Sequence, residues 1–176
     1  MTMSQRQTAS RRKGLQVVMG PDQHLHIGCG GHIRVQVVSA HFAALVVDDL
    51  CRIRHAPEGE ALLAACDALG HPVIIAPLET PIDPPNATIE PTDRRAATAA
   101  GRATGQVSAT GEPVLGLGTG CGSRICYDPA EWPWSGDPAC PSGARVLRAL
   151  LRQAWVNARG ADDPTDGETC LAHGEA

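Results

Sequence analysis

Aromatic residues are scarce in this sequence of 176 residues, because only 3% of them are Phe, Trp or Tyr. Apolar residues still make up 43% of the chain, a value typical of globular proteins. We therefore expect a hydrophobic core built mainly from Leu, Val, Ile and Ala. The length predicts one domain with tails, and a domain of this size can bury a sizeable core.

The sequence also lacks the run of about 18 consecutive apolar residues that a membrane-spanning helix needs, so we expect no membrane partner. The net charge of −4 is small. It argues against nucleic acid or a strongly charged molecule as a partner. The first residues lack the apolar run of a secretory signal peptide, which predicts a soluble protein.

The number of cysteines is odd, and together with the missing signal peptide this argues against a framework of disulfides. Cys51 and Cys66 fall on the apolar faces of predicted helices, where a free thiol packs as a small hydrophobic group. We therefore expect free thiols in a reducing compartment. The seven cysteines are Cys29, Cys51, Cys66, Cys121, Cys126, Cys140 and Cys170.

The spacing of apolar residues predicts an α+β domain over residues 15–160, in which a small antiparallel sheet packs against about three main helices. Apolar and polar residues alternate over 15–38, as they do in β-structure. Helical spacing and capping residues predict three helices, and short apolar runs predict two further strands. The helices are expected at 40–55, 57–69 and 142–159, and the strands at 73–75 and 123–127.

Three segments lack such periodicity. Residues 1–14 are polar and are expected to be disordered, and their Ser, Thr and Gln content also fits a type III secretion signal. Residues 77–113 are rich in proline and predict a long mobile loop, with a short exposed helix at 92–102. Residues 161–176 form an acidic polar tail.

Four residues of types that bind zinc lie close together near the start of the domain. They are His24, His26, Cys29 and His32. His24 and His26 would share one face of a strand, because side chains alternate along a strand. The second half of a structural zinc site would have to come from Cys121 and Cys126. The alternative is that the histidines are surface residues of an edge strand, and the sequence leaves both interpretations open.

The run from Gly116 to Gly122 is rich in glycine but lacks the Lys and Ser/Thr of a phosphate-binding P-loop. A predicted strand follows the run, whereas a dinucleotide-binding fingerprint would open a helix. The glycines therefore indicate a tight turn or a close approach of two backbones. Cys121, within the run, is a candidate nucleophile if the fold places a histidine beside it.

The last predicted helix carries a row of arginines, which we name the Arg stripe. Its members are Arg145, Arg148, Arg152 and Arg159. At about 100° per residue they fall within roughly 60° of the helix surface, opposite the apolar face. The Arg stripe is either a solvated face or a surface for anions or an acidic partner, because guanidinium groups bind carboxylates bidentately. Trp132 and Trp134, in the preceding loop, either anchor a partner or cover the edge of the sheet.

Several short motifs follow one another in a fixed order over residues 33–160. They are Pro57-Glu58-Gly59-Glu60-Ala61-Leu62-Leu63, Gly70-His71-Pro72-Val73-Ile74-Ile75, Gly118-Thr119-Gly120-Cys121-Gly122-Ser123, Tyr127-Asp128-Pro129 and Val146-Leu147-x-x-Leu150-Leu151. This order resembles that of the NleD-like bacterial type III effector zinc metallopeptidases. The resemblance implies a zincin-like scaffold whose last helix carries the zinc-binding motif HExxH.

The zinc-binding motif itself is missing from this chain. HExxH works because two histidines one turn apart bind zinc and the glutamate acts as general base. The resemblance places Arg148 and Arg152 at the histidine positions and Ala149 at the glutamate position. Arginine is not a zinc ligand, and alanine has no proton acceptor. The resemblance therefore implies a scaffold that has lost its zinc site, with no catalytic residue and no cofactor.

These observations favour a non-catalytic, effector-like protein that binds an unidentified protein partner. One alternative is a zinc-dependent hydrolase or protease with displaced ligands, drawn from the residues between His24 and His32. A second alternative is a structural or chaperone-like domain. The expected location is the bacterial cytoplasm, with secretion into a host cell and a role in virulence if residues 1–14 act as a signal. The sequence does not determine the oligomeric state.

Overall fold

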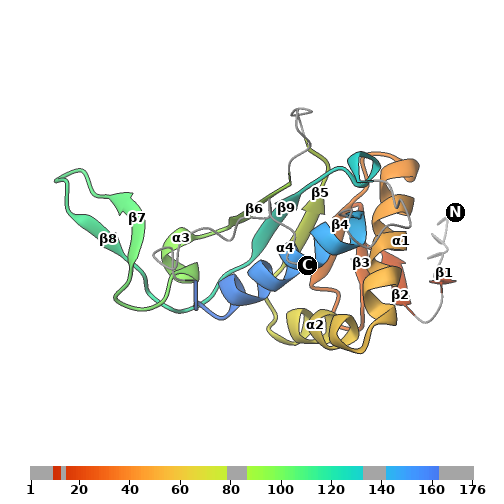
Figure 1. Cartoon of the computed structure of the whole chain (residues 1–176), viewed down its shortest axis with the longest axis horizontal. Helices are drawn as coiled ribbons and strands as arrows, with labels where there is room; N and C mark the ends of the chain where they lie inside the picture. The colour runs from red at the N-terminus through yellow and green to blue at the C-terminus, as the bar shows by residue number, and fades with distance from the viewer. Residues whose placement is uncertain (1–9, 13–14, 79–86, 133–141, 163–176) are drawn as a thin grey trace, which may run out of the picture.

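Two layers make up the fold, a β-sheet and three long helices that cover one of its faces (Figure 1). This computed structural model describes residues 10–12, 15–78, 87–132 and 142–162. The three helices contact one another and share one hydrophobic core with the sheet, so they lie on the same face. The predicted α+β class is therefore confirmed.

Within the described residues the sheet of this body contains seven strands, and its central part is parallel. In spatial order the strands are β1 (Ser10–Arg12), β2 (Leu15–Met19), β3 (His24–Ile27), β4 (Ile33–Gln36), β5 (Val73–Ala76), β9 (Ser123–Cys126) and β6 (Thr88–Pro91). β5 runs parallel to both β4 and β9, whereas the other neighbours are antiparallel. The prediction of a small antiparallel sheet is therefore wrong. The reason is the helical crossover between β4 and β5, because a long connection lets the chain return and pair in parallel.

The long helices begin and end close to the predicted residues. They are α1 (Ala40–His55), α2 (Pro57–Ala68) and α4 (Gly143–Ala158), and a 3-10 helix η1 (Pro129–Glu131) precedes the last. The Ser39 hydroxyl caps α1 by accepting a hydrogen bond from the Phe42 N–H at 3.1 Å. Ser142 caps α4 in the same way through the Arg145 N–H. Pro57 occupies the first turn of α2, where the missing N–H removes no helical hydrogen bond.

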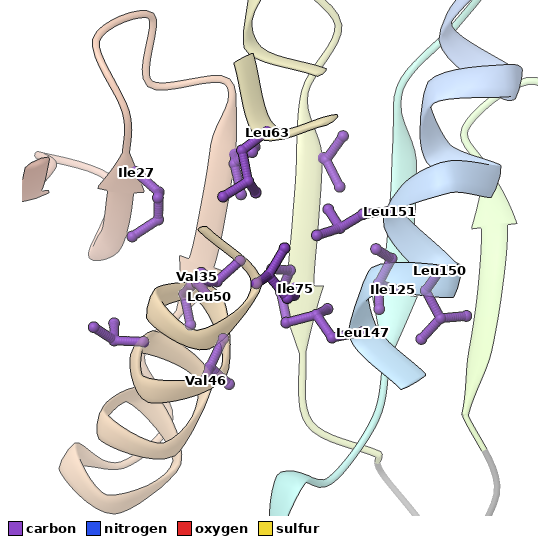
Figure 2. Packing of buried hydrophobic residues seen from close by; sticks show 14 of the residues in the cluster. Ile27, Val35, Val46, Leu50, Leu63, Ile75, Ile125, Leu147, Leu150 and Leu151 are labelled. Carbon is purple, nitrogen blue, oxygen red and sulfur yellow. The ribbon is translucent and has the colours of Figure 1, made fainter. Parts of the chain in front are cut away.

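Aliphatic side chains fill the space between the two layers, as Figure 2 shows. Val35, Ile75 and Ile125 come from the central strands and are fully buried. Leu50 of α1 and Leu147 of α4 pack against them and are equally buried. Each such side chain contributes about 1.5–3 kcal/mol to the free energy of folding, which explains how the core forms with so few aromatic residues.

Part of the segment 77–113, which the sequence predicts to be a loop, forms regular structure. Its elements are β6 (Thr88–Pro91), α3 (Arg94–Ala97), β7 (Ala103–Val107) and β8 (Pro113–Leu115). α3 lies inside the range 92–102 where a short exposed helix is predicted, but its Ala96 and Ala97 are buried. The strands escape sequence-based prediction because each is short and contains Pro or Gly, which weaken strand signals. Residues 79–86 lie outside the described residues.

The predicted tails are described only in part. Within residues 1–14, Ser10–Arg12 form β1 and pair antiparallel with β2, and the rest of that segment lies outside the described residues. At the other end, Asp162 joins the fold because its carbonyl oxygen accepts a hydrogen bond from the Ala99 N–H at 2.8 Å. The acidic tail beyond Asp162 is not among the described residues. In the part of the chain that the structure describes, no helix is both long enough and apolar enough to cross a bilayer.

Candidate functional site

His24 and His26 lie on one face of β3, as predicted, and both contact Asp22 in the preceding turn. The Nε2 atom of His26 lies 2.9 Å from Oδ1 of Asp22, and Nδ1 of His24 lies 3.0 Å from the Asp22 carbonyl oxygen. The hydrogen bond with His26 holds the pKa of Asp22 below its usual value. Arg34 also approaches this carboxylate, with Nη1 at 3.5 Å from Oδ2. The two histidines therefore belong to a local hydrogen-bonded turn.

Cys29 and His32 have partners elsewhere. The Sγ atom of Cys29 lies 3.7 Å from Oε1 of Gln16, and the His32 N–H donates to Oδ1 of Asp67 at 3.0 Å. Within the part of the chain that the structure describes, no three His, Cys, Asp or Glu residues are arranged to hold a metal ion. The hypothesis of a zinc site at the four predicted residues therefore gains no support from their arrangement.

The glycine-rich run packs its backbone against the end of α4. The Cys121 N–H donates to the Asn157 carbonyl oxygen at 3.1 Å. A side chain at Gly120 would collide with the carbonyl oxygen of Ala158, and the φ of 78° at this position favours glycine. The predicted close approach of two backbones is therefore confirmed. The Cys121 thiol is buried here and donates to the Asp93 carbonyl oxygen at 3.3 Å, which gives this cysteine a packing role.

The α4 positions that the resemblance assigns to the zinc motif make other contacts. The Nη2 atom of Arg148 lies 2.6 Å from Oε2 of Glu58, and this ion pair joins α4 to α2. Ala149 is half-buried and Arg152 is exposed. These residues hold and solubilise the helix, and none of them offers a metal ligand.

Two further residues of the Arg stripe, Arg145 and Arg159, also interact with other groups of the chain. The Arg159 guanidinium stacks over the Trp155 ring, 4.6 Å from its centroid, and Arg145 has an interaction partner as well. Intramolecular contacts therefore account for much of the Arg stripe. Trp132 packs against the hydrophobic core, which fits the interpretation that it covers the fold. Trp134 lies outside the described residues.

A pocket of about 790 Å³ opens between α2 and the part of the sheet formed by β2 and β3. Its volume lies within the range of about 300–1,000 Å³ that is usual for ligand sites. Its wall consists mainly of apolar side chains, several of which belong to the core. They are Leu15, Ile27, Ile33, Leu63, Ala64 and Ala68. This pocket is the candidate functional site.

Polar groups border the pocket and hold its loop in place. Arg54, at the end of α1, pairs with Glu60 of α2, with Nη2 and Oε1 3.3 Å apart. The Asp67 carboxylate accepts hydrogen bonds from the Gly30 N–H at 2.6 Å and from the His32 N–H at 3.0 Å. A Cβ at Gly30 would lie 2.7 Å from Oδ1 of Asp67, so the loop needs glycine there to approach the carboxylate.

Cys29 is the exposed thiol of the pocket. Cys66 lies on the core side of α2, and burial raises the pKa of its thiol to about 12, so it stays protonated at neutral pH. Sequence reasoning missed the pocket because its wall comes from separate segments at 15–16, 27–33 and 54–68. The one local signal is the Gly28-Cys29-Gly30 sequence, which places a thiol between two glycines.

Comparison with known proteins adds no assignment. The chain matches no protein-family model, no curated protein and no solved structure.

Proposed function

We propose that this protein is a non-catalytic, effector-like binding protein on a scaffold similar to that of the NleD-like metallopeptidases but without their zinc site. The ion pair between Arg148 and Glu58, 2.6 Å long, carries this proposal. It uses a position that the resemblance assigns to a zinc ligand to attach α4 to α2. A guanidinium group stays protonated and repels a metal cation, and Ala149 supplies no general base.

The pocket beside α2 is the proposed binding site, and its proposed occupant is a segment of a protein partner. An apolar side chain placed against Leu15 and Leu63 would leave water, which stabilises the complex by about 25 cal/mol per Å². The rim carries two carboxylates, Glu60 and Asp67, and one guanidinium, Arg54. Negative charge is therefore in excess, so a Lys or Arg beside the apolar side chain is favoured over an acidic residue.

Selection of displayed peptides on the full-length protein tests this proposal. Binding of the selected peptides is then compared for the wild type, Ala64→Phe and Ala44→Phe. Ala64 lines the pocket, so the larger side chain fills part of it, whereas Ala44 is an exposed alanine of α1 outside the pocket. We expect peptides with an apolar residue next to Lys or Arg, and binding to Ala64→Phe at least about tenfold weaker than to Ala44→Phe.

Two results would contradict the proposal. Peptides that bind Ala64→Phe as tightly as the wild type would move the binding site away from the pocket. Elemental mass spectrometry of the same preparation tests the non-catalytic part of the proposal. A stoichiometric amount of zinc, with loss of folding in chelator, would favour the zinc-dependent hydrolase instead.

A further inference from the structure

The outer edge of β2 borders the pocket, and β1 covers part of this edge (Figure 1). β2 spans Leu15–Met19, whereas β1 pairs, within the described residues, with Leu15, Gln16 and Val17. Leu15 and Gln16 also line the pocket. Met19, which lies beyond the residues paired with β1, is 42% exposed. A strand that pairs along the whole of this edge therefore lies beside the pocket and covers Met19 as well.

The backbone groups of β2 alternate between its two edges. The Gln16 carbonyl oxygen accepts a hydrogen bond from the Gly28 N–H at 3.0 Å, so the N–H and C=O groups of Gln16 face the side of β3. In an antiparallel sheet, the same groups of the neighbouring residues face the opposite side. The backbone groups of Leu15, Val17 and Met19 therefore face the outer edge, where an extended segment can pair with them.

The side chains of a strand added at this edge alternate between the two faces of the sheet. Leu15 and Val17 are buried and belong to the core on the face that the helices cover. A residue directly opposite Leu15 in an antiparallel strand lies on this same face, with its Cβ about 4.5–5.5 Å from that of Leu15. Every second side chain of such a strand can therefore enter the apolar pocket, while backbone hydrogen bonds hold the strand in place.

β1 occupies this edge without supplying an apolar residue. In the register, Arg12 is opposite Leu15 and Ser10 is opposite Val17. The whole strand reads Ser-Arg-Arg, so both positions on the pocket side of the register are polar. A segment with apolar residues at these two positions would bury them against Leu15 and Val17, which β1 cannot do. Such a segment therefore gains more from the edge than β1 does.

The charge of β1 matches the charge that the pocket rim favours. Arg11 and Arg12 make β1 basic, whereas the rim carries two carboxylates and one guanidinium group. β1 is therefore similar to the proposed partner segment in charge and in extended conformation. Only two residues separate β1 from β2 in the chain, so β1 can leave the edge while β2 stays paired with β3.

We infer that a segment of the protein partner binds as an added strand of the sheet. It takes the place of β1, pairs antiparallel with the outer edge of β2, and places its apolar side chains in the pocket. β1 is then an internal competitor, which has to leave before the partner segment binds. This binding mode rests on the proposed function, and it adds a pairing geometry and a competitor.

Methylation of single backbone nitrogens in a selected peptide tests the added strand. A paired strand turns every second N–H towards its neighbour, and a methyl group there removes the donor. With the full-length wild type, we expect methylation at alternate positions to weaken binding at least about tenfold, and methylation at the positions between them to weaken it less than about threefold. If peptides whose binding is weakened by Ala64→Phe show no such alternation, the added strand is wrong and the proposed function still stands.

Paired proline substitutions in the full-length protein test the competitor. Ser10→Pro combined with Arg12→Pro removes two N–H groups from the pairing with β2 and so releases β1. Ser4→Pro combined with Arg6→Pro is the control, since it replaces the same residue types at the same spacing ahead of β1. We expect the first variant to bind the selected peptides at least about fivefold more tightly than the wild type, and the control to bind them like the wild type.

Circular dichroism of both proline variants checks that the body remains folded. Equal affinities of the two variants would overturn the inference, because β1 would then not oppose binding. If the variant in β1 unfolds, the methylated peptides still decide between the outcomes, because they are measured with the wild type. Peptides that bind Ala64→Phe as tightly as the wild type would overturn the proposed function and, with it, the added strand.

Discussion

Among the described residues, Asp49 is the only Asp, Glu, Lys or Arg that is buried, with 6% of its surface exposed. The Tyr127 hydroxyl donates to its Oδ2 atom at 3.1 Å, and the Arg52 guanidinium lies 4.0 Å from Oδ1. Burial raises the pKa of Asp49 above its ordinary value of 3.8, and the bonds with Tyr127 and Arg52 offset this only in part. Burial also raises the pKa of Tyr127, so its hydroxyl remains a donor.

This carboxyl group should make stability depend on pH. A raised folded-state pKa means that the folded chain binds the proton more tightly than the unfolded chain, so the contribution is fully present below about pH 3.8. It is lost as the pH rises through the folded-state pKa. Asn cannot ionise, so Asp49→Asn lacks this loss. We therefore expect the free energy of unfolding of Asp49→Asn, relative to that of the wild type, to increase as the pH is raised from acidic to neutral, as measured by urea unfolding. Glu90→Gln, on exposed strand β6, is the control, and a pH-independent difference for Asp49→Asn would contradict the assignment.

For single residues, the sequence predicts which face of an element a side chain occupies but not which group it contacts. The alternation along β3 correctly places His24 and His26 on one face. Their contact with Asp22 was not predicted, because it depends on the conformation of the turn. The partner of Asp49 could not be predicted either, because Tyr127 lies 78 residues further along the chain. Periodicity reports which side of an element is apolar and gives no distance between elements.

Among the elements, α4 has the largest share in joining the layers, because it contacts α1, α2, β6 and β9. Leu147 of α4 is fully buried in the hydrophobic core that joins the helices to the sheet. We expect Leu147→Ala to lower the free energy of unfolding by about 2–5 kcal/mol, since the smaller side chain leaves a cavity. Arg152→Ala, on the exposed side of the same helix, should change it by less than about 0.5 kcal/mol. Equal losses in urea unfolding would mean that α4 is not oriented as described.

The same helix shows why some elements can be predicted and others cannot. α1, α2 and α4 follow the helical spacing of their apolar residues and their capping residues, all of which are local signals. The parallel pairing of β5 with β4 and β9 has no local signal, because it is decided by how the helices pack on the sheet. β7 contains Gly105, and β8 begins with Pro113, so their sequences read as turns.

Across the whole molecule, the proposed binding pocket lies far from the two-stranded ribbon of β7 and β8, and we name residues 102–116 of this ribbon the arm. The pocket adjoins β2 and α2, whereas the arm extends from the opposite end of the sheet, as Figure 1 shows. No residue of the arm belongs to the hydrophobic core that joins the sheet to the long helices. The arm can therefore be altered without removing a residue of the core or of the pocket.

Removal of the arm should leave the body folded. The chain enters and leaves the arm at adjacent points, because the Gly116 N–H donates to the Arg102 carbonyl oxygen at 2.8 Å. Two glycines in place of residues 103–115 can therefore bridge the gap without strain. We expect the melting temperature to fall by less than about 5 °C, as followed by circular dichroism.

The shortened protein should also still bind the peptides selected at the pocket, because no residue of the arm lines it. If it unfolds, the arm is part of the folding unit. If it folds but no longer binds the peptides, the pocket depends on the arm, which would contradict the separation of the two. A folded, peptide-binding variant would show that the body and its pocket form without the arm, since the residues that stabilise the body all lie outside residues 103–115.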